Sequence, residues 1–174
     1  KPTYKNNGMF YIIKLADSSV LIIDGGNSNQ FPDSRCDELM NMLWDITGKQ
    51  KGETVKIAGW FITHSHVDHH RGFVAFTQKY SKYLDRERVF FALPSLNTTE
   101  EILQSGSGPG GYQRIIDTVD NYFADDDPDF LRLHTGQTFS LADVSFEVLQ
   151  THEDLVNPAT GATMVTNYND VSTV

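Results

Sequence analysis

The sequence predicts a mixed α/β domain with a layered sheet, and two observations lead to that expectation. Apolar, partly β-branched runs lie toward both ends of the chain, with the length and boundaries typical of buried strands. Between them lie segments in which apolar residues recur at helical spacing. The 174 residues are enough for one domain with a sizeable core, so residues 1–174 are expected to form a single domain.

The first half of the chain is expected to contain a β-hairpin, a helix and a buried strand. The hairpin strands are residues 9–15 and 19–24, with Ala-Asp-Ser turning between them. Residues 36–47 carry apolar side chains near a helical period, with Asp33 or Ser34 as the cap and Gly48 as the stop. The run Ile-Ala-Gly-Trp-Phe-Ile-Thr at 57–63 is expected to be the buried strand.

The second half is expected to alternate helices and short strands. A helix over 73–83 carries aromatic residues along one side, which favours a core role over a substrate site. The Gly/Ser-rich residues 105–111 are expected to form a loop, and no Lys-Ser/Thr follows them as in a phosphate-binding loop. The remaining elements expected are a helix over 115–123 and strands over 89–92, 130–133, 137–141 and 144–149.

Residues 63–70, Thr-His-Ser-His-Val-Asp-His-His, hold four of the six histidines and are called the histidine cluster below. Imidazole nitrogens and carboxylate oxygens are ligands for zinc and related ions. His64 and His66, two residues apart in extended backbone, point to the same side and are expected to coordinate one ion together. Asp68 and His69 are expected to reach a second ion position beside the first. His70 is expected to point elsewhere, to solvent or as an outer donor. A metal-free surface loop is the alternative, and the preceding buried strand disfavours it.

The pattern His-x-His-x-Asp-His after an apolar strand resembles the metallo-β-lactamase superfamily. Residues 20–26, Val-Leu-Ile-Ile-Asp-Gly-Gly, resemble its early strand, whose Asp (here Asp24) supports the metal loop by hydrogen bonding. The strand-like residues 146–152 end in His152, where the family supplies a third ligand to its first metal. Residues 169–174, Asn-Asp-Val-Ser-Thr-Val, resemble the Asn-x-x-Ser strand start of the ComEC-like branch, named after the competence protein of DNA uptake.

This resemblance implies the four-layer αββα sandwich of the family and a metal-dependent hydrolase. His64, His66 and His152 would hold a first ion, and Asp68 and His69 a second. The ions would be zinc, one or two per chain, with manganese or iron as alternatives. Such an ion lowers the pKa of bound water to about 7. Asp68 would also act in catalysis by orienting this water or taking its proton, and Asp24 would support the site from outside.

The family also has features that would follow Val174. These are a strand ending in Gly-Asp, whose carboxylate bridges the two metals, and a later His. We therefore expect the C-terminal part of the sandwich to be missing, and this chain, as an N-terminal portion of the domain, to be weakly active or inactive by itself. An uncovered sheet edge would favour a homodimer.

Two other functional classes compete with a hydrolase. One is a non-catalytic metal-binding or interaction module that retains the fold. The other is a di-iron redox enzyme of the same fold, which is disfavoured because Ser65 and Val67, rather than Glu, lie between the ligands. For the hydrolase, the expected partner is a small-molecule or phosphodiester substrate.

Composition limits the partners further. The net charge of −9 does not support a nucleic-acid surface, which normally gathers basic residues on one face, although the ComEC-like pattern points toward such substrates. No stretch approaches the roughly 20 apolar residues of a membrane helix. Cys36 is the single cysteine, so no internal disulfide forms, and the sequence leaves the compartment undetermined.

Overall fold

The computed structural model describes residues 9–27, 33–86, 88–91, 110–123, 129–151, 154–155, 157–162 and 164. In chain order the elements are β1 (Tyr11–Lys14), β2 (Val20–Ile23), α1 (Asp33–Thr47), β3 (Val55–Ile62), α2 (Val67–Tyr80), the 3₁₀ turn η1 (Ser81–Tyr83), β4 (Leu84–Arg86), β5 (Arg88–Phe91), α4 (Gly110–Phe123), β6 (Asp129–Arg132), β7 (Thr138–Leu141) and β8 (Val144–Glu147).

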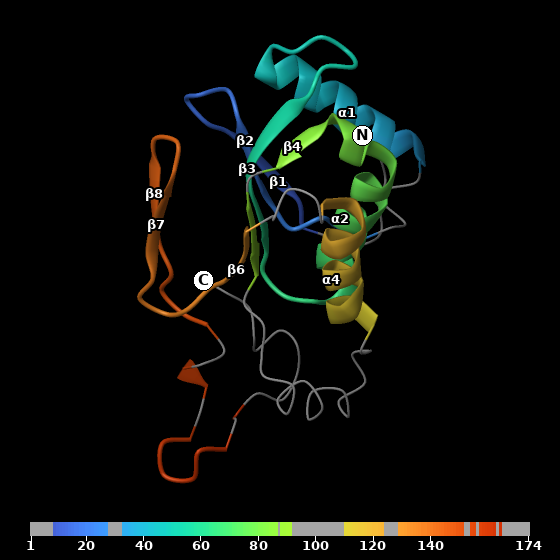
Figure 1. Ribbon diagram of the computed structural model, residues 1–174. Coiled ribbons are helices and arrows are strands. Elements are labelled where there is room, and N and C mark those ends of the chain that lie inside the picture. The colour runs from blue at the N-terminus through green and yellow to red at the C-terminus, as the bar shows by residue number, and fades with distance from the viewer. Residues whose placement is uncertain are drawn as a thin grey trace.

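These elements form three layers, which confirms the mixed α/β class. Helices α1, α2 and α4 cover one face of a sheet of six strands, and the β7–β8 hairpin covers the other face (Figure 1). The order helix, sheet, sheet corresponds to three of the four layers that were expected. Within the described ranges, no helix covers the outer face of β7 and β8.

The main sheet has the order β1-β2-β3-β5-β6, with β4 also paired to β3. β1 and β2 form the predicted antiparallel hairpin, with Tyr11 opposite Ile23. β2, β3, β5 and β6 run parallel to one another. Parallel neighbours need a crossover connection, and α1 supplies it between β2 and β3. The carboxyl ends of β2 and β3 therefore meet at one edge of the sheet.

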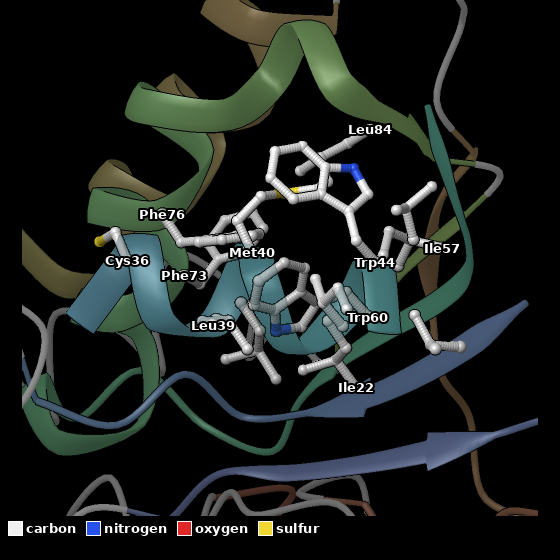
Figure 2. Close-up of a cluster of buried hydrophobic side chains, with 14 of the residues drawn as sticks. Ile22, Cys36, Leu39, Met40, Trp44, Ile57, Trp60, Phe73, Phe76 and Leu84 are labelled. Atoms are coloured by element: carbon white, nitrogen blue, oxygen red, sulfur yellow. The ribbon is translucent and has the colours of Figure 1, made fainter. Parts of the chain in front are cut away.

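The helix-side core is built around Trp60 of β3. Its ring packs edge-on against Phe73 of α2, with ring centroids 4.8 Å apart, and both side chains are fully buried. Figure 2 shows how α1, α2 and the sheet converge on this region. The surrounding buried residues include Ile22, Cys36, Leu39, Met40, Trp44, Ile57, Phe76 and Leu84.

A second core lies between the two sheets and depends on the alternating pattern of β7 and β8. Phe139 and Phe146 face the main sheet, where Phe61 and Phe90 stack at a centroid distance of 4.3 Å. Gly59 permits the close approach, because a Cβ there would lie 2.9 Å from side-chain atoms of Leu141 and Phe90. The residues at the alternate positions are polar and exposed: Thr138, Ser140, Ser145 and Glu147.

All three described α-helices begin earlier than the sequence predicted. The helix expected over 36–47 begins at Asp33, so Asp33 and Ser34 lie in its first turn rather than preceding it as the cap. The helix expected over 73–83 begins at Val67, and its last three residues form the 3₁₀ turn η1. The helix expected over 115–123 begins at Gly110. In α2, the polar first turn hid the helical period, while Asp68 there interacts favourably with the positive end of the helix dipole. None of the described helices is long and apolar enough to cross a bilayer.

Phe90→Ala tests the core between the sheets. Phe90 is fully buried and stacks on both Phe61 and Phe139, so truncation should lower the free energy of unfolding by about 3–5 kcal/mol. Urea denaturation followed by circular dichroism measures this loss. The control is Met42→Ala, at a side chain 46% exposed, which should change stability by less than about 0.5 kcal/mol. Equal effects from both variants would contradict the packing described.

Candidate metal centre

The ends of β2 and β3 bring Asp24 against the start of the histidine cluster. The backbone N–H of Asp24 donates to the Phe61 carbonyl at 2.6 Å, which continues the pairing past the end of β2. The indole Nε1 of Trp60 donates to the Asp24 carbonyl at 2.9 Å. The backbone of Asp24 is thus fixed by the same strand that leads into the cluster.

The Asp24 carboxylate is fully buried and accepts hydrogen bonds from two residues of the cluster. Oδ1 accepts from the backbone N–H and the Oγ1 hydroxyl of Thr63, each at 2.9 Å. Oδ2 lies 2.8 Å from Nδ1 of His69. A buried carboxylate is costly unless it is bonded in this way. These contacts are of the kind predicted for Asp24, and its support of a metal site stays a prediction.

The chain leaves Asp24 through two glycines that serve different purposes. Asp24 itself has φ +59° and Gly26 has φ +63°, both in the left-handed region, which Gly adopts without steric cost and Asp tolerates. Gly25 instead permits contact, because a Cβ there would overlap the backbone nitrogen of Phe73. Helix α2 therefore sits directly on the turn that holds Asp24.

His64 and His66 face one another, as expected for two ligands of one ion. Nε2 of buried His64 lies 3.1 Å from Nδ1 of His66. In a tetrahedral zinc site with Zn–N bonds of 2.0–2.1 Å, two ligand nitrogens lie about 3.3 Å apart. The other ring nitrogen of His64 contacts Thr63 Oγ1 at 3.1 Å, so Nε2 is the nitrogen that faces His66. The spacing of this pair therefore fits a zinc-like ion.

Asp68 and His69 lie in the first turn of α2 rather than in a loop. Nδ1 of His69 is taken by Asp24, so Nε2 is its free coordinating atom, and Asp68 Oδ2 lies 3.9 Å from it. The His69 ring is also 3.9 Å, centroid to centroid, from that of His64. The two pairs, His64 with His66 and Asp68 with His69, are therefore adjacent.

Burial acts to lower the pKa of His69, because it disfavours the charged imidazolium. The hydrogen bond and charge of Asp24, together with the charge of Asp68, outweigh burial and raise that pKa above its ordinary value of 6.5. The two carboxylates thus favour the protonated form of the His69 ring over the neutral form in which it would coordinate a metal ion.

His70 is fully buried, and its side chain acts as a donor rather than pointing to solvent. Nδ1 lies 2.8 Å from the His66 carbonyl oxygen, to which it donates. Burial lowers the pKa of His70 to about 4, with the nearby charges of Arg114 and Arg71 adding to the effect. The ring is therefore neutral at pH 7 and carries its single proton on Nδ1.

Two predicted site features fall outside the described residues, His152 and the segment 169–174, and so do residues 105–109 of the expected Gly/Ser-rich loop. Within the described ranges, no three His, Cys, Asp or Glu side chains come together as a metal-binding group, so the cluster provides pairs of ligands there. Thr151, just before His152, is buried, and its N–H donates to Thr135 Oγ1 at 2.9 Å. The assignment of His152 as a ligand stays a prediction.

The structure adds two residues that the sequence analysis did not single out. Thr63 Oγ1 lies within 3.3 Å of Asp24, of Nδ1 of His64 and of Nδ1 of His69, and so connects the carboxylate to both ligand pairs. Gly111 of α4 lies against the Ser65 carbonyl. Thr63 could have been found from its position between the buried strand and the first His of the cluster. Nothing in the sequence indicated the role of Gly111.

Comparison with known proteins gives structural likenesses only. No family model matches the sequence, and no curated protein matches it significantly. A metallo-β-lactamase HARLDQ-motif mutant from Cronobacter sakazakii is 14% identical, with a TM-score of 0.42 over 80% of this chain and 45% of that one. BJP-1, a subclass B3 metallo-β-lactamase of Bradyrhizobium japonicum, is 15% identical, with a TM-score of 0.43 over 82% and 45%. The chain spans less than half the length of both, and likenesses of this strength assign neither a family nor an activity.

Asp24→Asn tests the electrostatic role of the buried carboxylate in metal-free protein. The variant keeps the shape but removes the charge, so burial should dominate and the pKa of His69 should fall below 6.5. A proton NMR titration of the histidines measures this change.

The same variant changes how stability depends on pH. Because the folded-state pKa of His69 is raised in the wild type, its contribution is fully present below pH 6.5 and is lost as pH rises through that raised pKa. Asp24→Asn should remove this contribution. A His69 pKa that stays above 6.5 in the variant would exclude Asp24 as the cause.

Proposed function

We propose that this chain carries the metal-binding half-site of a metal-dependent hydrolase of the metallo-β-lactamase fold. The observation that supports this most directly is the 3.1 Å approach of His64 Nε2 and His66 Nδ1. Asp68 and His69 lie beside this pair, and Asp24 and Thr63 hold it from the buried side. The order of these residues along the chain is the one that the sequence resemblance implies.

In this proposal each residue has a distinct task. His64 and His66 hold a first ion, with His152 as its third protein ligand, and Asp68 and His69 hold a second. The ions are zinc, with manganese or iron as alternatives. When bound, such an ion supplies hydroxide near neutral pH. Asp68, whose side chain is 35% exposed, orients the attacking water or takes its proton. Asp24 engages Nδ1 of His69, which keeps Nε2 directed to the metal.

The proposed reaction is hydrolysis of a phosphodiester or of a small-molecule ester or amide. A net charge of −9 does not favour a long nucleic-acid track, so within the ComEC-like branch a short phosphodiester is the better substrate. Among the described strands β1 lies at an edge of the main sheet, with Tyr11 and Ile13 53% and 44% exposed, and an uncovered edge of this kind would favour a homodimer.

A non-catalytic metal-binding module is the second candidate. It is favoured by the described residues, among which no three His, Cys, Asp or Glu side chains gather as a metal-binding group. Two ions held close together without a bridging anion repel each other. We therefore propose that the His64–His66 site fills first and that the second site fills incompletely.

Metal content and turnover separate these candidates. Elemental analysis after dialysis against Zn²⁺ should give at most one ion per chain, and His66→Ala should abolish it by removing a ligand. The matched control is His134→Ala, an exposed histidine outside the cluster, which should leave metal content unchanged. For the hydrolase, an assay on an activated phosphodiester should then show weak turnover that is lost in His66→Ala. Two tightly bound ions with multiple turnover would contradict the incomplete second site, and zinc binding without hydrolysis of any ester tested would favour the module.

A further inference from the structure

His70 adjoins the proposed ligands without being one of them. Its ring lies one helical turn after His66 in α2, and Nδ1–H donates to the His66 carbonyl at 2.8 Å. Its other nitrogen, Nε2, is buried with no hydrogen-bond partner among the described residues. His70 also joins no group of three ligands in the described part of the chain. The ring is therefore committed to the backbone of the cluster.

Helix α4 contacts the same stretch of backbone from a different element. Helices α2 and α4 pack side by side, as Figure 1 shows. Gly111, in the first turn of α4, is buried so closely against the cluster that a Cβ would overlap the Ser65 carbonyl oxygen and lie 3.0 Å from Cε1 of His70. The absence of a side chain at Gly111 thus lets α4 press on both Ser65 and the His70 ring.

These two contacts act on adjacent peptide units. The Ser65 carbonyl belongs to the unit between His64 and His66, so a rotation of that unit would turn the His66 side chain relative to His64. The His66 carbonyl belongs to the next unit, where it accepts the backbone N–H groups of His69 and His70 as well as Nδ1–H of His70. The 3.1 Å approach of Nε2 and Nδ1 depends on that orientation. A general core role for His70 would not require its one N–H to be directed at a ligand's own backbone.

We propose that His70 is a positioning residue, which, backed by Gly111 of α4, holds the 65–66 backbone so that His66 Nδ1 faces His64 Nε2. This inference rests on the proposed function, because it concerns the metal-binding pair. It adds a role for α4, an element that contributes no proposed ligand.

Two substitutions at position 70 separate positioning from packing. His70→Leu keeps an apolar volume but removes the donor, and should weaken Zn²⁺ binding about 10- to 100-fold, the usual effect of losing an outer partner of a ligand. His70→Asn places an amide N–H near the position of Nδ1 and should restore most of that affinity. Competition with a chromophoric chelator measures the dissociation constant, and thermal melts of metal-free protein show whether each variant is folded.

Gly111→Ala tests the contact from the α4 side. The added methyl group should displace Ser65 and weaken Zn²⁺ binding, with a changed absorption spectrum for bound Co²⁺. The control in the same helix is Asn121→Ala, at an exposed position, which should leave both unchanged. Long-range ¹H–¹⁵N NMR of metal-free wild type should show the His70 proton on Nδ1, and this measurement applies even where His70→Leu does not fold.

Several outcomes would overturn the inference. Folded His70→Leu with wild-type Zn²⁺ affinity, His70→Asn as weak as His70→Leu, or a His70 proton on Nε2 would each exclude the positioning role while leaving the proposed function intact. Wild-type protein that binds no Zn²⁺ would overturn the proposed function and this inference with it.

Discussion

The buried carboxylate of Asp24 is the constraint on which the rest of this structure depends. A buried carboxylate needs hydrogen-bond donors around it, and Thr63 and His69 provide them for Asp24. To bring them there, β2 and β3 must end side by side and α2 must begin immediately after the cluster. The left-handed backbone at Asp24 and the lack of a side chain at Gly25 let α2 settle against the turn. A single buried carboxyl group thus links the end of the sheet to the start of a helix.

Local patterns were sufficient for much of the fold. The hairpin of β1 and β2, helix α1 and the buried strand β3 all follow from the spacing of apolar residues within each segment. They were predicted with boundaries that differ by a few residues from those observed. The pairing of His64 with His66 follows from extended backbone between them, which is also a local property. The supporting role of Asp24 was predicted only from the resemblance to a family motif. Nothing near Asp24 in the chain indicates that Thr63 is its hydrogen-bond partner.

The remaining features arise from contacts between distant segments. The start of α2 at Val67 was missed because its first turn is polar, and its stability comes from packing of Phe73 and Phe76 on β3. The direction of His70 was left open because it depends on whether another element covers it. Gly111 belongs to a Gly-rich run that looked like a loop, and its close approach to Ser65 is a tertiary relationship without a sequence signal.

The proposed ligands among the described residues, together with Asp24 and Thr63, come from one continuous stretch, β2-α1-β3-α2, between residues 24 and 70. The contacts of Asp24 with Thr63 and His69 span 39 and 45 residues, and because the entropy cost of closing a loop grows only slowly with its length, this unit is expected to form before the later strands leave the ribosome. The histidine pair would then be available before β5, β6 and the β7–β8 hairpin are made. A nascent chain would thus be able to take up an ion first and complete its domain around it afterwards.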